Sequence, residues 1–196
     1  ELKIEYQSNE KKSKETILAD KALIAVGRKP STDNLGLEEL GVKRDKNGFL
    51  CVNDKLETSV ANILAIGDCI PGPMLAHKAE EDGVAAVEMI AGGSAHIDYN
   101  LVPSIIYTHP EVASVGKTEE HLKSQNINYN VGKFPFSANS RARANDDTNG
   151  FVKILADSVS DKILGVHIIG PEAGTLIHEC ACLLYTSQSP RDRQKS

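Results

Sequence analysis

Gly67 and Asp68 follow directly after the apolar run of residues 63–66, and they are well suited to bind a ligand. A buried strand that ends in Gly-Asp places a carboxylate at the edge where open parallel α/β sheets bind their ligands. Shortly afterwards residues 74–78 open an amphipathic helix, whose N-terminus offers free backbone N–H groups and a positive dipole end. A carboxylate that accepts from sugar hydroxyls, beside such donors, suits a nucleotide-type cofactor. The Gly-Asp pair alone would equally fit an ordinary surface turn.

The four cysteines form no recognisable redox or metal centre. Cys51, Cys69, Cys180 and Cys182 make neither a C-x-x-C nor a C-x-x-x-x-C pair, and no histidine cluster accompanies them at zinc-ligand spacing. Sparse cysteines of this kind are typical of reduced intracellular thiols. We therefore predict no metal site and assign no catalytic residue. Cys69 is expected to be a small packed side chain.

Composition excludes several classes of function. The 196 residues are 40% apolar and 25% charged, with a net charge of −5, and the length allows one large domain or two small ones. The acidic balance argues against nucleic acid as a partner. No apolar stretch reaches the roughly 18 residues of a membrane span. The sequence opens on Glu1 and strand-like residues rather than a signal peptide, as expected of an internal fragment.

Hydrophobic periodicity predicts an α/β arrangement up to about residue 100. Strands are expected at residues 2–6, 16–19, 22–26 and 63–66, of which the last two are apolar on both faces and should be buried on both. A short helix is expected at residues 34–40, and a longer amphipathic helix is expected to run from Leu75 to Ile90 before the glycines that end it.

The pattern then changes to that of an α+β unit. Antiparallel strands are predicted at residues 104–107, 112–115, 129–136, 151–156 and 163–169, and residues 137–149 read as a polar loop. One helix should cover residues 119–124 with Thr118 as its N-cap, and another should run from Gly174 to about Leu184. Residues 183–196 have no hydrophobic period and read as a disordered or foreign tail.

Several of these segments together resemble the two-dinucleotide-binding flavoprotein disulfide reductases. The likeness rests first on residues 25–30, 34–37 and 65–68. A narrower likeness, to the flavin component shared by the 2-oxo acid dehydrogenase complexes, rests on residues 74–80, 96–100, 103–111 and 134–136. The matching segments occur in order and with the expected gaps from about residue 2 to residue 179.

The resemblance implies the fold class and the domain boundaries. The chain would be the α/β end of a two-dinucleotide-binding flavoprotein, followed by an α+β dimerisation domain. Residues 1–27 would close the NAD-binding domain, and residues 28–100 would be the returning part of the FAD-binding domain. Residues 101–182 would form a truncated dimerisation domain, ahead of the tail at 183–196.

The same resemblance implies FAD and NAD as cofactors. Asp68 would accept a hydrogen bond from a ribityl hydroxyl of FAD. Gly27 would pass close to the nicotinamide dinucleotide, where a Cβ would clash. The ring and ribityl side of the flavin would lie along the helix start, at Met74, Leu75, Ala76 and His77, where backbone N–H groups favour negative charge. His77 could otherwise simply cap the helix or pack.

The activity implied by the resemblance moves electrons from dihydrolipoamide through a redox disulfide and FAD to NAD. The protein would be a homodimer that serves the lipoyl-bearing acyltransferase component of 2-oxo acid dehydrogenase complexes, in the mitochondrial matrix or the bacterial cytoplasm. This sequence contains no C-x-x-x-x-C pair, no G-x-G-x-x-G loop and no C-terminal His-Pro base motif of the family. His109 and Pro110 match another family position and do not replace that base. Because these motifs are missing, the chain itself should be inactive.

Two alternatives stay open. The parent could be a related flavoprotein disulfide reductase that acts on glutathione, mercury or another disulfide, because the region that would discriminate is not in this sequence. The chain as it stands could also be a non-catalytic module that dimerises through residues 103–179.

Overall fold

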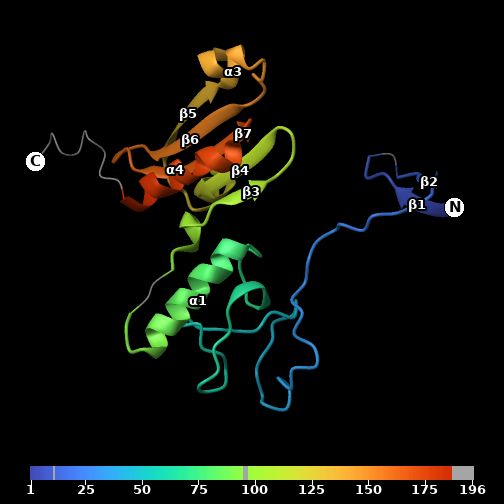
Figure 1. Cartoon of the computed structure of the whole chain (residues 1–196), viewed down its shortest axis with the longest axis vertical. Coiled ribbons are helices and arrows are strands. Elements are labelled where there is room, and N and C mark those ends of the chain that lie inside the picture. Colours follow the sequence, from blue (N-terminus) through green and yellow to red (C-terminus); the bar gives the residue numbers. More distant parts are fainter. Residues whose placement is uncertain (11, 95–96, 187–196) are drawn as a thin grey trace, which may run out of the picture.

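The computed structural model of the chain describes residues 1–10, 12–94 and 97–186. Three parts follow one another along the sequence (Figure 1). They are an N-terminal hairpin, a middle part built around one long helix, and a C-terminal antiparallel sheet with helices. This order agrees with the predicted passage from α/β to α+β. No helix within the described ranges is long and apolar enough to cross a membrane.

The N-terminal hairpin confirms the first two predicted strands. β1 (Leu2–Gln7) pairs antiparallel with β2 (Lys14–Ala19), and Leu2 lies opposite Ala19. Most of their side chains are exposed, and the hairpin stands apart from the rest of the chain (Figure 1). Because a lone two-stranded hairpin is marginally stable, these strands need a further surface to pack on.

The prediction of a buried strand at residues 22–26 is wrong. No strand forms there, and Leu23, Ile24 and Val26 are 92%, 84% and 94% exposed. A strand of this kind needs neighbours that pair with its N–H and C=O groups and layers that cover both of its faces. Nothing in the described part of the chain supplies either, so the apolar pattern has no sheet to join.

The strand predicted at residues 63–66 is also wrong in extent. Leu64 makes only an isolated antiparallel bridge with Glu57. Ala65 is buried, but Ile66 is 39% exposed. The physical reason is the same, since a parallel strand cannot be completed without neighbouring strands.

The helix predicted at residues 34–40 is replaced by consecutive turns. Leu40 N–H donates to the carbonyl of Gly36, but Asn34 and Gly36 have φ values of +61° and +68°. These left-handed values lie outside the right-handed helical region. The segment is therefore a folded loop, although an apolar period runs through it.

The middle part is organised by α1 (Ala76–Ile90), which confirms the predicted amphipathic helix. Its inner side faces a small apolar core made of Val42, Leu50, Leu56, Ala65, Ile70 and Ala86. Val84, Val87 and Ile90 lie on another side of the helix and are 57%, 65% and 70% exposed. α1 therefore carries apolar surface beyond what this core covers.

The C-terminal part is a five-stranded antiparallel sheet in the order β3-β4-β7-β6-β5 (Figure 1). It confirms all five predicted strands, with bounds that differ by a residue or so from the expected ones. They are β3 (Ser104–Ile106), β4 (Glu111–Gly116), β5 (Tyr129–Pro135), β6 (Phe151–Asp157) and β7 (Ile163–Gly170).

Helix α4 (Ala173–Thr186) covers one face of this sheet. Its Ala173 and Ile177 are fully buried with Ala113, Val166 and other inward-facing residues of β4 and β7. Residues 183–186 are helical, although the predicted tail includes them, and residues 187–196 of that tail lie outside the described residues. His96, which belongs to the likeness above, also lies outside them. The predicted domain boundaries remain predictions.

Two short helices flank the sheet. α2 (Glu119–Ser124) begins as predicted, with the Thr118 hydroxyl accepting from His121 N–H at 3.2 Å. The predicted polar loop instead contains η3 (Phe136–Ala138) and α3 (Ser140–Ala144), whose N-cap Asn139 accepts from Ala142 N–H. Five residues are too few for hydrophobic periodicity to reveal a helix, so the cap was the available signal.

His167 is a half-buried titratable group of the sheet whose ring nitrogens have no hydrogen-bond partner among the described residues. It lies in β7 beside Lys153 of β6, and both of its ring nitrogens are inaccessible and unpaired. Burial, and then the positive charge of Lys153, lower the pKa of His167 below its ordinary value of 6.5, while Glu119 and Glu120 act weakly in the opposite direction.

We expect this histidine to make the chain less stable in acid. Because the pKa is 6.5 in the unfolded chain and lower in the folded one, the unfolded chain binds more protons below that pH. The contribution of neutral His167 to the free energy of unfolding is fully present above pH 6.5. It falls as the pH drops below 6.5, by at most about 1.4 kcal/mol per pH unit. Urea unfolding near pH 7, 6 and 5 should show a smaller fall in the His167→Gln variant.

The exposed His121 provides the control, because His121→Gln should leave the acid-dependent fall as it is. An identical fall in the two variants would contradict the assignment to His167.

Candidate functional site

The structure brings Asp68 and the start of α1 together, as the sequence predicts. Gly67–Cys69 forms the single turn η1, which contacts α1. Gly67 has a φ of +72°, a left-handed conformation that redirects the chain at the end of the apolar run. The Asp68 side chain is 36% exposed, so its carboxylate remains accessible beside the helix.

The Asp68 carboxylate pairs with Arg28, which the sequence analysis did not single out. Arg28 donates from Nη2 to Oδ2 of Asp68, and its Nη1 lies 3.5 Å from the carbonyl oxygen of Met74. Within the described residues Oδ1 of Asp68 accepts no hydrogen bond. Arg28 therefore orients the carboxylate and leaves one oxygen for a ligand. In the sequence, the position of Arg28 next to Gly27, a predicted site residue, was the feature that could have indicated its role.

A buried ion pair lies beneath η1. Lys78 and Asp82 occupy successive turns of α1, both side chains are 0% exposed, and Nζ lies 2.6 Å from Oδ2. Lys78 also donates to the carbonyl of Gly67 at 3.1 Å, while Asp82 accepts from Gly67 N–H at 2.9 Å. The two charges therefore hold both polar groups of the residue that precedes Asp68. Sequence analysis missed this pair, because charges at i and i+4 more often lie on a solvated helix face.

Tyr99 completes the pair. It belongs to η2 (Tyr99–Leu101), donates its hydroxyl to Oδ1 of Asp82 at 2.8 Å, and places its ring 5.3 Å from Lys78 Nζ. Burial first, and then the hydrogen bond that Tyr99 donates to Asp82, raise the pKa of Tyr99 to about 12, so the hydroxyl remains a donor. A buried ion pair is tolerated when its remaining hydrogen-bonding sites are filled in this way.

The N-terminus of α1 is open toward solvent. Leu75 is the N-cap residue but makes no side-chain hydrogen bond, and the first turn contains no acidic residue. The first N–H groups of a helix have no partner within it. With no described side chain capping them, those of Ala76 and His77 can donate to an electron-rich group of a ligand.

The other predicted site residues have contacts of their own. His77 Nε2 lies 2.8 Å from the carbonyl oxygen of Pro103, which ties the first turn of α1 to the segment before β3. Gly27 has a φ of +130° and no described atom within 4 Å of where a Cβ would stand. Its backbone conformation alone favours glycine. The roles of these residues toward cofactors stay predictions.

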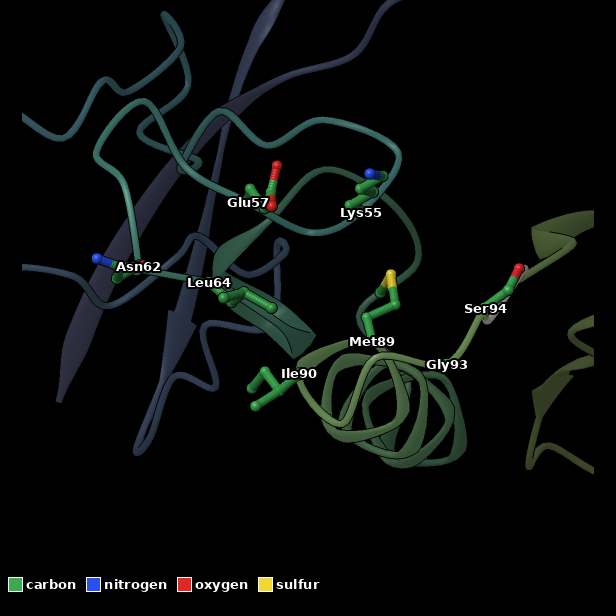
Figure 2. A pocket seen from close by; sticks show the side chains of 8 residues that line it. All are labelled: Lys55, Glu57, Asn62, Leu64, Met89, Ile90, Gly93 and Ser94. Atoms are coloured by element: carbon green, nitrogen blue, oxygen red, sulfur yellow. The ribbon is translucent and has the colours of Figure 1, made fainter.

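A hollow of about 660 Å³ lies away from this site (Figure 2). It opens between a loop and the C-terminal end of α1, and its lining residues are Lys55, Glu57, Asn62, Leu64, Met89, Ile90, Gly93 and Ser94. The helix places Met89 roughly 20 Å from the open N-terminus at Ala76. The hollow and the Asp68 edge are therefore separate features.

The described residues contain no group of three or more side chains that could hold a metal ion. Cys69 forms no disulfide, and its thiol lies 3.1 Å from the carbonyl oxygen of Ile66. The chemistry available at the site is thus acceptance by a carboxylate and donation by backbone amides.

Two family models match the chain. The model described as pyridine nucleotide-disulphide oxidoreductase matches residues 2–83, and the dimerisation domain of the same family matches residues 102–194. Together these matches include both the Asp68 edge and the antiparallel sheet.

Curated relatives are similar over most of this chain. It is 59% identical over 177 residues to dihydrolipoyl dehydrogenase 2, mitochondrial, of Arabidopsis thaliana, and 57% identical over 178 residues to dihydrolipoyl dehydrogenase, mitochondrial, of Sus scrofa. These alignments include 90% and 91% of this chain but 35% of each relative. The chain therefore spans about a third of the length of the curated relatives it matches.

Solved structures share the fold. LpdA from Mycobacterium tuberculosis superposes with a TM-score of 0.83 at 27% identity, over 93% of this chain and 40% of that one. The Cu(II) complex of the HOCl-induced flavoprotein disulfide reductase RclA from Escherichia coli gives 0.79 at 25% identity, over 94% and 42%.

The left-handed turn at Gly67 yields a stability prediction. Gly67→Ala should destabilise the chain by about 1–2 kcal/mol, because an L residue is strained in this region. The new Cβ would also lie 3.2 Å from the Cβ of Ala79. Chemical denaturation measures the change in the free energy of unfolding.

Gly83→Ala is the matched control, since Gly83 lies inside α1 and its new Cβ would meet Ile66 at an ordinary 3.7 Å. That variant should be stabilised by up to about 1 kcal/mol. Equal changes in both variants would contradict the strained turn.

Proposed function

The chain belongs to the pyridine nucleotide-disulphide oxidoreductases, and within that family we propose that it is part of a dihydrolipoyl dehydrogenase that uses FAD and NAD. The observation that carries the proposal is the meeting of the Asp68 carboxylate with the uncapped start of α1, in a chain 57–59% identical to enzymes of that name. The activity belongs to the whole protein, of which this chain would supply about a third.

The residues present fit a flavin nucleotide. Asp68 has one carboxylate oxygen held by Arg28 and another that can accept from a ribityl hydroxyl. The backbone amides at Ala76 and His77 can donate to the electron-rich side of the ring, with Met74 and Leu75 beside them. FAD, when bound, supplies two-electron transfer between a dithiol and NAD. The chain's own part is to bind the flavin and to keep a positive helix end beside it.

The C-terminal sheet supports assembly as a homodimer. The dimerisation-domain match covers it, and it presents exposed apolar side chains that a second copy could bury, among them Ile106, Tyr107, Val131 and Phe134. We further propose the lipoyl-bearing acyltransferase of a 2-oxo acid dehydrogenase complex as partner and the mitochondrial matrix as location. The names of the curated relatives support that location.

The chemistry with thiols would come from residues outside this sequence. Its 196 residues include no C-x-x-x-x-C pair and no G-x-G-x-x-G loop. Gly27 would adjoin the nicotinamide dinucleotide, and its exposed left-handed backbone is compatible with a close approach. The likeness to RclA keeps a related flavoprotein disulfide reductase as the second candidate, but the higher identity to dihydrolipoyl dehydrogenases favours the first.

A chimera tests the proposal. Residues 1–182 would replace the matching segment of the pig relative, which supplies the remaining segments of a whole enzyme. The chimera should bind FAD and reduce NAD with dihydrolipoamide. Bound FAD with activity only toward another disulfide would instead favour the second candidate.

Asp68→Ala in the chimera should weaken FAD binding roughly 10- to 150-fold. This range corresponds to the loss of a hydrogen bond to a charged group, about 1.5–3 kcal/mol. The recovery of flavin fluorescence on dilution measures the dissociation constant. Asp161→Asn, in the exposed turn between β6 and β7, is the control and should change nothing. Unaltered flavin retention in Asp68→Ala would sink the site assignment.

A further inference from the structure

We propose that Lys78 and Asp82 form a positioning pair, which fixes the Gly67 peptide and thereby holds the Asp68 carboxylate where the cofactor needs it. This inference rests on the proposed function, because it assigns a role toward the same flavin site. Neither residue touches the open edge, since both side chains are fully buried beneath it.

The pair forms hydrogen bonds with both backbone polar groups of Gly67, the residue before Asp68. Lys78 donates to the Gly67 carbonyl at 3.1 Å, and Asp82 accepts from the Gly67 N–H at 2.9 Å. The carbonyl of Gly67 lies in the same rigid peptide plane as the nitrogen of Asp68. Fixing that plane fixes the position of the Asp68 Cα and so limits the directions in which its side chain can leave the backbone.

Stability alone does not account for two charges at these positions. Removing charges from water is costly, and a well-packed apolar pair of similar volume often stabilises a fold equally or better. What an apolar pair cannot supply is directional hydrogen bonding to the Gly67 peptide. The charged side chains therefore fit the task of orienting a backbone turn rather than the task of filling a core.

The surroundings leave the pair little freedom. Tyr99 occupies the second oxygen of Asp82 at 2.8 Å. The stem of Lys78 passes close to Gly72, where an added Cβ would lie 3.4 Å from its Cε. Tyr99 belongs to η2, which packs against β4 and α4. Through Tyr99, the segment that leads into the sheet therefore holds Asp82 in place.

A double-mutant cycle in the FAD-loaded chimera tests the inference. Lys78→Met combined with Asp82→Leu removes both charges at similar volume, so the helix can still pack. FAD affinity should fall roughly five- to fiftyfold, less than on removal of the Asp68 carboxylate itself, because the carboxylate is still present but is no longer held in place. The same paired substitution should have almost no effect in the Asp68→Ala background, because the residue it positions is then gone.

The buried core residue Val42 gives a matched control. Val42→Ala lowers stability without reaching Gly67, so any effect on FAD affinity should be equal with and without Asp68. The positioning role is overturned if the paired substitution lowers FAD affinity equally with and without Asp68, as Val42→Ala should. It is also overturned if the paired substitution leaves FAD affinity unchanged while Asp68→Ala weakens it. If Asp68→Ala itself leaves FAD affinity unchanged, the proposed site fails and this inference fails with it.

A milder variant covers the case in which the paired substitution does not fold. Tyr99→Phe removes only the hydroxyl that braces Asp82. FAD affinity should fall roughly two- to tenfold, less than for the paired substitution because both hydrogen bonds to the Gly67 peptide remain, and the fall should disappear in the Asp68→Ala background. An equal fall in both backgrounds would refute the positioning role.

Discussion

Two opposite charges that are wholly removed from water, on Lys78 and Asp82, persist because both oxygens of Asp82 are paired and Lys78 donates to the Gly67 carbonyl as well as to Asp82. Asp82 takes Lys78 and the Gly67 N–H on one oxygen and Tyr99 on the other. The arrangement of η1 depends on this pair, since the Gly67 N–H would otherwise be buried without a partner and the Gly67 carbonyl would keep only the hydrogen bond from the Ile70 N–H. The exposed carboxylate of Asp68 has a defined direction as a result.

The apolar surface of the chain is larger than its own cores can cover. Leu23, Ile24 and Val26 are almost fully exposed, and the apolar side chains on one side of α1 are more than half exposed. Surfaces of this kind mark places where other protein is bound. The exposed apolar residues in the segment after β2 and on α1 agree with a chain that spans about a third of its curated relatives.

Sequence patterns predicted the elements whose pairing or packing partners lie within the described residues. The five strands of the sheet, α1, and α2 with its Thr118 cap follow from periodicity and capping rules. Residues 22–26 failed because a strand is completed by partners, and periodicity carries no information on whether they exist. Arg28 was missed because its partner Asp68 lies 40 positions away in the sequence. The Lys78–Asp82 pair was missed because the burial of a charge depends on contacts that are distant in sequence.

The segment between α1 and the sheet is held at two separate points. His77 bonds to Pro103 from the first turn of the helix, and Asp82 bonds to Tyr99 from the second. With a single contact the segment could rotate about that contact, whereas two contacts on successive turns of α1 restrict its rotation relative to the helix. Rotation of this segment about α1 would therefore break at least one of two hydrogen bonds, and the one from Tyr99 ends on Asp82, which also holds the Gly67 N–H.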